Sequence, residues 1–276
     1  MKKLKYATIV EEAKKILRQY NVTMTLRQLY YRLVAKLILA NTMNNYKALS
    51  KWMVKARERG DINEAYIEDR VRQTFGGDSG YESPDGFIKS YEDWFRGCWD
   101  NFAYNMWTTQ PQALELWVEK DALSRLVSEE GDKFNVVTCP SRGYSSYSYV
   151  RKGVRRINRH GKHVKVLYLG DFDPSGMDIE RDLQSRLIRY GAEDVDVERV
   201  ALTLEQIREY NLPPMPAKTS DPRLAAFQAD TGGSDAVELD ALEPPVLQQL
   251  INDAIVAEID QDAWDKRLTE TEEEKQ

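Results

Sequence analysis

The stretch Lys165-Val-Leu-Tyr-Leu-Gly-Asp-Phe-Asp-Pro-Ser-Gly-Met-Asp178 decides the fold that the sequence predicts. It is a short apolar run that stops at two carboxylates, Asp171 and Asp173, and continues into turn residues and a helix-like segment. A second apolar run, residues 114–118, stops in the same way at Glu119. Apolar runs of this length bounded by turn residues are typical of buried strands. The sequence therefore predicts two buried strands that end in acids.

Strands and helices alternate on both sides of these two runs. Such alternation predicts a Rossmannoid α/β domain, a parallel sheet with helices on both faces. If the first and third strands are neighbours, their carboxyl ends bring Glu119, Asp171 and Asp173 into one crevice. The expected strands are residues 113–118, 135–138, 165–169 and 195–201, and the expected helices between them are residues 121–130, 145–159 and 176–190.

Three carboxylates in one crevice repel one another unless a cation lies between them. Mg²⁺ suits such a site, because it prefers oxygen ligands, binds through one or two carboxylates and keeps the rest of its shell for water and phosphate. We therefore expect Glu119, Asp171 and Asp173 to bind Mg²⁺. An Asp-x-Asp after a strand is also typical of an ordinary solvated turn, because Asp favours turns and helix N-caps.

The first 75 residues predict a winged-helix, or helix-turn-helix, domain. Helical periodicity is present at residues 8–20, 25–37 and 45–59, and residues 61–72 form a candidate hairpin. The third helix would enter the DNA groove. It carries the expected DNA-binding residues Lys47, Lys51 and Lys55.

The net charge of −6 hides a strong segregation of charge. Residues 1–75 carry 16 Lys or Arg and 7 Asp or Glu, and residues 142–165 carry 8 basic residues and no acid, whereas residues 166–276 carry 10 basic and 26 acidic residues. The basic regions predict surfaces that neutralise DNA phosphates, although charge runs also occur on ordinary solvated faces. Arg142 lies in a βα loop that would hold a phosphate, unless the loop is a plain turn.

Two consecutive tyrosines lie on the second predicted helix. Tyr30 continues its apolar stripe, while Tyr31 is turned by about 100° and shares a face with Arg27. We expect Tyr30 in the core and Tyr31 displayed next to a cation. Periodicity alone favours a structural role for both rings, because tyrosine is common at half-buried positions.

These motifs resemble a known family. The Glu-Lys-Asp of residues 119–121 and the Asp-x-Asp-Pro-x-Gly of residues 171–176 are similar to the two signatures of a Toprim domain. Together with Thr25-Leu-Arg-Gln-Leu-Tyr-Tyr31 and Pro140-Ser-Arg-Gly-Tyr-Ser-Ser146, they resemble the A subunit of topoisomerase VI and its relative, the meiotic double-strand-break transesterase. Glu238-Leu-Asp-Ala-Leu242 resembles a segment at the same relative place, so the resemblance covers about residues 8–260.

The resemblance implies a small, Mini-A-like type IIB topoisomerase A subunit that cleaves double-stranded DNA with Mg²⁺. Tyr31 would attack the DNA and form a 5′-phosphotyrosyl link, Arg27 would face the phosphate, and Glu119 would both bind metal and move a proton. The family also implies a homodimer in which Tyr31 of one copy meets the metal site of the other. The sequence has no recognisable ATP-binding motif, so strand passage would need a separate B-type ATPase subunit.

Two alternatives stay open at this point. One is a Toprim nuclease that hydrolyses DNA without a covalent intermediate, with Tyr31 in a structural role. The other is a non-catalytic DNA-binding protein whose acids bind a metal for structure only.

The expected domain organisation has four parts, with the winged-helix domain first. A helix in the connector is expected to bury Trp94, Phe95, Trp99 and Phe102 between the domains. No run is apolar and long enough to cross a bilayer, and the start does not resemble a signal peptide, so we expect a cytoplasmic, nucleoid-associated protein without membrane contact. The four expected parts of the chain are the winged-helix domain at residues 1–75, an aromatic connector at 76–112, a Toprim domain with a C-terminal extension at 113–262, and an acidic disordered tail at 263–276.

Overall fold

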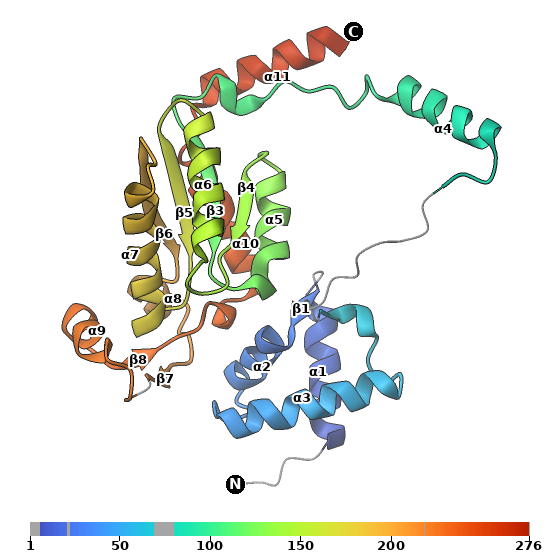
Figure 1. Ribbon diagram of the computed structural model, residues 1–276. Coiled ribbons are helices and arrows are strands. Elements are labelled where there is room, and N and C mark those ends of the chain that lie inside the picture. The colour runs from blue at the N-terminus through green and yellow to red at the C-terminus, as the bar shows by residue number, and fades with distance from the viewer. Residues whose placement is uncertain (1–5, 21–22, 69–79, 218, 276) are drawn as a thin grey trace.

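The structure is a computed structural model that describes residues 6–20, 23–68, 80–217 and 219–275. A helical N-terminal module and a larger α/β domain contact each other directly, and residues 84–97 of the connector stand apart from both (Figure 1). None of the helices within the described ranges combines the length and the apolar character that crossing a membrane requires.

A four-stranded parallel sheet forms the centre of the larger domain, in the order β4-β3-β5-β6. The predicted α/β fold and its parallel sheet are thus confirmed. The chain passes from β3 to β4 on one side and then to β5 on the other, so the point where the strand order reverses lies between β3 and β5. The strands are β3 (Ala113–Val118), β4 (Val137–Pro140), β5 (Val164–Leu169) and β6 (Val195–Ala201).

Helices cover both faces of this sheet (Figure 1). Leu114, Leu116 and Val118 of β3 belong to one buried cluster, and Ala113 and Trp117 belong to another on the opposite face, as the two-residue period of a strand requires. The first cluster includes side chains of α5 (Ser124–Asp132) and α10 (Pro244–Val256), and the second includes side chains of α6 (Tyr147–Arg159) and α7 (Pro174–Arg189).

The segment after β6 returns to the carboxyl ends of the strands. Phe172 and Val237 exchange two backbone hydrogen bonds of 2.9 Å, which place residues 238–243 beside the ends of β3 and β5. This placement brings acidic residues from a distant part of the sequence to the edge where Glu119 and Asp171 lie. The elements of this region are α8 (Leu204–Glu209), β7 (Met215–Pro216), α9 (Leu224–Thr231), β8 (Asp235–Ala236) and η4 (Leu239–Ala241).

The N-terminal module contains the three predicted helices. Thr25 caps α2 through a capping box with Gln28, in which each side chain accepts a hydrogen bond from the other residue's backbone N–H. The buried cluster of the module continues through η4 into the α/β domain. The elements are α1 (Tyr6–Gln19), β1 (Met24–Thr25), α2 (Leu26–Ala35), α3 (Met43–Glu58), η1 (Glu64–Tyr66) and β2 (Ile67–Glu68).

The hairpin expected at residues 61–72 is not formed by its described part. Residues 61–68 end in η1 and β2, and β2 pairs in parallel with β1 rather than with a following strand. Residues 69–72 lie outside the described residues. The winged-helix interpretation therefore stays a prediction, supported by the three helices alone.

The acidic C-terminal segment is a helix where the composition predicted disorder. Helix α11 (Gln261–Lys275) packs on the chain near η2 (Met106–Thr108). The Trp264 ring lies 5.7 Å from the Trp107 ring, and the Arg267 guanidinium lies 3.9 Å from the centre of the Tyr104 ring. These aromatic contacts hold the helix in place, so the prediction of disorder from its acidic composition was wrong.

The connector helix also differs from its prediction. Helix α4 (Pro84–Gly97) forms, but none of its residues is buried, and it stands away from both halves of the molecule (Figure 1). Trp94 and Phe95 are 66% and 72% exposed. The expectation that this helix buries its aromatic rings between the domains was wrong. Residues 76–79 of the connector lie outside the described residues.

Candidate active site

Glu119 and Asp171 meet at the carboxyl ends of β3 and β5, where the strand order reverses. The Glu119 N–H donates to the Leu169 carbonyl over 2.8 Å, and the Asp171 N–H donates to Glu119 Oε2 over 3.0 Å. Open α/β sheets bind their ligands at this position. The structure thus brings together the acids of the two predicted strands.

The two carboxyl groups hold their protons more tightly than usual. Burial raises the pKa of Glu119 to about 7, and the charge of Asp171 adds to the rise. Burial also raises the pKa of Asp171 to about 6, although the Lys120 ammonium acts in the opposite direction. Two buried acids whose charges disfavour each other form a site that a divalent cation would stabilise.

Asp173 has a different role in this conformation. It is the N-cap of α7, and its Oδ1 accepts hydrogen bonds from the Gly176 N–H at 2.6 Å and the Ser175 hydroxyl at 2.8 Å. Its oxygen is therefore committed to the helix terminus, as the solvated-turn alternative anticipated.

Glu119 and Asp171 are the two acids of the site that could hold a magnesium ion, without a third. Among the described residues, no group of three or more His, Cys, Asp or Glu side chains is arranged to hold a metal ion. A Cβ atom at Gly170 or Gly176 would lie 2.9 or 3.2 Å from Glu119 Oε2, so both glycines keep space free around this carboxylate. Mg²⁺ needs only one or two carboxylates. The set of three metal ligands stays a prediction.

Lys120 neutralises the acids of this site in the present conformation. Its Nζ lies 3.0 Å from Asp171 Oδ1, 3.1 Å from Glu238 Oε2 and 2.8 Å from Asp240 Oδ2. Burial disfavours the charge of this ammonium group, but the three carboxylates outweigh burial and raise the pKa of Lys120 well above its ordinary value. Lys120 thus occupies the place of a counter-ion for three acids.

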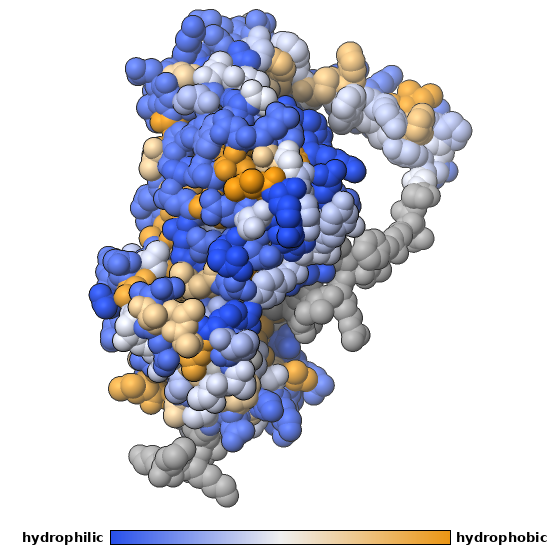
Figure 2. Space-filling model, turned by 60° about the vertical axis from the view of Figure 1, so that its left-hand side comes forward, coloured by the Kyte–Doolittle hydropathy of each residue, from blue (hydrophilic) through white to orange (hydrophobic). Residues whose placement is uncertain are grey.

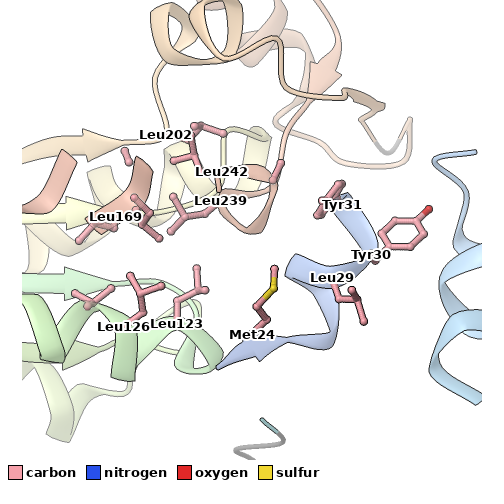
Figure 3. Close-up of a cluster of buried hydrophobic side chains, with 14 of the residues drawn as sticks. Met24, Leu29, Tyr30, Tyr31, Leu123, Leu126, Leu169, Leu202, Leu239 and Leu242 are labelled. Carbon is pink, nitrogen blue, oxygen red and sulfur yellow. The ribbon is translucent and has the colours of Figure 1, made fainter. Parts of the chain in front are cut away.

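Tyr31 is buried, contrary to the expectation that it is displayed. Both Tyr30 and Tyr31 are only 1% exposed. The Tyr30 hydroxyl donates to the Thr42 carbonyl at 3.0 Å, on the side of α3, whereas Tyr31 lies on the side of α2 that faces Leu239 and Leu242 (Figure 3). As predicted, Tyr30 and Tyr31 point to different sides of α2. However, η4 covers the side that carries Tyr31, which the N-terminal module alone would expose.

The surroundings of Tyr31 disfavour its phenolate. Burial raises the pKa of Tyr31 above its ordinary value and the charge of Glu238 raises it further, whereas Lys120 and Arg27 act in the opposite direction. Tyr31 therefore lies within the electrostatic reach of the acidic cluster that holds Lys120. In the conformation described, the hydroxyl is neutral at physiological pH.

Ionic contacts fix α2 on residues 238–243. Arg27 Nη1 lies 3.2 Å from Glu238 Oε1, and the Thr25 hydroxyl donates to Asp240 Oδ1 at 3.0 Å. Arg32 contacts Glu243 at 2.6 Å and donates to the Ala241 carbonyl. Arg27, the expected phosphate ligand, thus has a carboxylate as its partner in this state.

The expected DNA-binding lysines lie on one exposed face. Lys47, Lys51 and Lys55 follow one another at four-residue intervals on α3 and are all exposed. Arg142, with a side chain 72% exposed, contacts Asp121 at 3.0 Å in a loop whose Gly143 N–H donates to the Glu119 carbonyl at 3.2 Å. The structure brings Arg142 to the acidic site and leaves the α3 lysines on the N-terminal module.

Three residues of the site had no role assigned from sequence: Lys120, Glu238 and Asp240. All three residues lie within motifs that the sequence analysis quoted, the Glu-Lys-Asp of residues 119–121 and the segment from Glu238 to Leu242. These motifs were the sequence feature that could have indicated a role for them. Their meeting depends on the backbone pairing of Phe172 with Val237, a contact between positions 65 residues apart that no local pattern predicts.

The chain matches no protein-family model, and no curated protein matches it. The resemblance to topoisomerase VI A subunits therefore depends on the sequence motifs alone.

Proposed function

We propose that this chain is a Mg²⁺-dependent enzyme that cleaves double-stranded DNA by tyrosine transesterification, like a type IIB topoisomerase A subunit. The observation that carries this proposal is the meeting of Glu119 and Asp171 at the reversal point of a parallel sheet, with Tyr31 within the electrostatic reach of Lys120, the counter-ion of Asp171. The motif resemblance supplies the reaction type, and the charge of the N-terminal module supports the substrate class.

Each residue has a defined part in the proposed reaction. Glu119 and Asp171, with Asp173 beside them, would hold Mg²⁺, which would neutralise the phosphate and the leaving oxygen when bound. The Tyr31 oxygen would form a bond to phosphorus while the bond from phosphorus to the 3′ oxygen breaks. The phenol proton would pass to Glu119. Glu119 would pass this proton on to the leaving 3′ oxygen, so the products are a 5′-phosphotyrosyl link and a 3′ hydroxyl.

The buried position of Tyr31 implies that α2 separates from residues 238–243 before the reaction. DNA phosphates carry the same charge as Glu238 and Asp240, so they would compete for Arg27 and Lys120 as the interface opens. The exposed lysines of α3 would bind the DNA backbone first. This sequence of events assigns the ionic contacts of α2 a protective role in the absence of DNA.

The connector allows the same interface to form between two chains. Helix α4, in the described part of the connector, stands away from both halves, so the N-terminal module of one copy could dock on residues 238–243 of another (Figure 1). The resemblance implies this exchanged arrangement and a homodimer that cuts both strands. Strand passage would need a separate ATPase subunit.

Hydrolysis by a Toprim-like nuclease is the second candidate, and the burial of Tyr31 favours it. A phenol that is 1% exposed, with a raised pKa, is typical of a structural tyrosine. In this mechanism Glu119 and Asp171 would hold Mg²⁺ near the attacking water, and α2 would only bind DNA.

One experiment separates the two candidates. The protein is incubated with Mg²⁺ and end-labelled duplex DNA and then denatured, and protein-linked and free cleaved DNA are measured for wild type, Tyr31→Phe, Tyr30→Phe and Asp171→Ala. The Tyr30 variant is the matched control, because this tyrosine is equally buried on the same helix. Transesterification predicts adducts in wild type and Tyr30→Phe only. Cleavage without adducts that survives Tyr31→Phe would support hydrolysis.

A further inference from the structure

Helix α4 presents an apolar face that the chain itself leaves uncovered. Its large side chains recur at the spacing of one helix face, and each is about half exposed or more. They gather on an arm that stands away from the rest of the molecule (Figures 1 and 2). The residues of this face, with the following turn, are Phe87 (45%), Ile88 (53%), Tyr91 (54%), Trp94 (66%), Phe95 (72%) and Trp99 (50%).

The physical cost of this exposure is high. An isolated helix of 14 residues is marginal in water even with a favourable sequence. Monomeric proteins rarely expose a contiguous apolar patch of several hundred Å², and larger patches mark interaction sites. The rings already pack on one another, with Phe87 centred 4.7 Å from Tyr91 and 4.9 Å from Tyr81, so the face is partly ordered before it meets a partner.

We propose that this aromatic face of α4 binds the same face of a second copy of the chain. Among the described residues, no other helix or strand carries as many exposed large apolar side chains. The remaining exposed large apolar side chains come from separate elements, one or two each, such as Leu37, Val137, Ile188 and Leu268. We therefore expect the α4 face of one copy to bind the α4 face of the other. In an interface with two-fold symmetry, both copies use the same patch in this way.

The apolar area of the α4 face is large enough for a dimer interface. Six large side chains with about 150–250 Å² each, exposed by about half or more, give about 600 Å² per copy, so a pair buries about 1,200 Å². This area lies at the lower end of the range of specific, stable interfaces, about 1,200–2,000 Å². Pairing of α4 would hold two connectors together and leave both N-terminal modules free to dock on either chain. The proposal does not depend on the reaction at Glu119 and Asp171.

The full chain tests this proposal by its mass in solution. Sedimentation velocity is measured for wild type, for Trp94→Ser with Phe95→Ser, and for the matched control Lys89→Ser with Asp93→Ser on the polar side of the same helix. We expect wild type and control to sediment as dimers and the aromatic variant as a monomer of 31.9 kDa. Thermal unfolding of the α/β domain should be unchanged, because α4 contributes no residue to the core.

A second variant locates the interface. Tyr91 lies at the middle of the face, so Tyr91→Cys in a Cys98→Ser background should form a disulfide-linked dimer under mild oxidation. A wild-type monomer at micromolar concentration, a dimer that survives the Trp94 and Phe95 substitutions, or no Tyr91→Cys cross-link would overturn the proposal. Monomers that bind phospholipid vesicles through α4 would assign the face to a lipid surface instead. Cleavage activity is not the readout, so loss of dimerisation and failure of the proposed reaction remain distinguishable.

Discussion

Lys120 Nζ lies 3.0 Å from Asp171 Oδ1, and this ion pair links the predicted metal site to the acidic segment that covers Tyr31. The same ammonium contacts Glu238 and Asp240, which in turn bind Arg27 of α2 and the N-cap of that helix, Thr25. One lysine thus lies between the acids at the sheet edge and the helix that carries the tyrosine. Removal of the Lys120 side chain should therefore affect both the acids at the sheet edge and the position of α2.

Replacing Lys120 by Met should destabilise the metal-free protein. Asp171, Asp240 and Glu238 would lose their shared counter-charge, and breaking a buried ion pair typically costs about 3 kcal/mol. Chemical denaturation in the presence of a chelator measures the loss. Mg²⁺ should restore more stability to this variant than it adds to wild type, since it replaces the missing charge. Lys14→Met, which removes a surface pair with Glu11, is the control and should change stability by less than about 1 kcal/mol.

Replacing Glu119 by Gln should stabilise the metal-free protein at high pH. Folding raises the pKa of Glu119 from 4.5 to about 7, so the folded state disfavours the charged form, and wild-type stability falls as pH rises through this window. The shift corresponds to about 3 kcal/mol at pH 8. Melting curves should show the variant more stable at pH 8 and equal to wild type near pH 4. An unchanged difference across this range would contradict the raised pKa of the Glu119 carboxyl group.

Replacing Lys51 by Ala should weaken DNA binding without changing its sequence preference. An exposed lysine on α3 that binds one phosphate should lower the slope of log affinity against log salt by about 1. Fluorescence anisotropy with duplexes of several sequences measures both quantities. Lys15→Ala, on α1 of the same module, is the matched control. Equal effects of the two variants would mean that the net charge of the module, rather than the α3 face, attracts DNA.

Mixing two inactive variants should restore activity if the modules are exchanged between copies. Tyr31→Phe retains the metal site, and Asp171→Ala retains the tyrosine, so a mixed dimer contains one complete pair only when Tyr31 acts on the partner's acids. We expect adduct formation to recover to about a quarter of the wild-type level, as random mixing with one working site in half of the dimers requires. A mixture that stays inactive would show that each tyrosine serves its own chain.

The alternation of apolar runs with helical segments was sufficient to predict the parallel sheet and the edge where Glu119 and Asp171 meet. This prediction succeeded because both residues follow buried strands directly, so local pattern determined their place. The burial of Tyr31 was not predictable in the same way. It depends on η4, which the Phe172 and Val237 pairing brings from a distant part of the chain.

Local sequence pattern gave wrong predictions for α4 and α11, because contacts with other parts of the molecule decide whether these segments are buried or ordered. The aromatic residues of α4 were expected inside the molecule because of their hydropathy, and the acidic residues of α11 were expected to be disordered because of their charge. The structure leaves Trp94 exposed and holds Trp264 against Trp107. Hydropathy indicates that a face needs a partner, but it does not say which part of which chain supplies the partner.

The identity of the residue linked to DNA tests the central claim most directly. Wild-type protein is trapped on duplex DNA with Mg²⁺, the DNA is trimmed by nuclease, and trypsin then cuts after Arg27 and Arg32 to release residues 28–32, which contain both tyrosines. Fragmentation of this peptide by mass spectrometry distinguishes the two. We expect a nucleotide mass on Tyr31 and none on Tyr30. A nucleotide on any other residue, or cleaved DNA with no modified peptide, would contradict it.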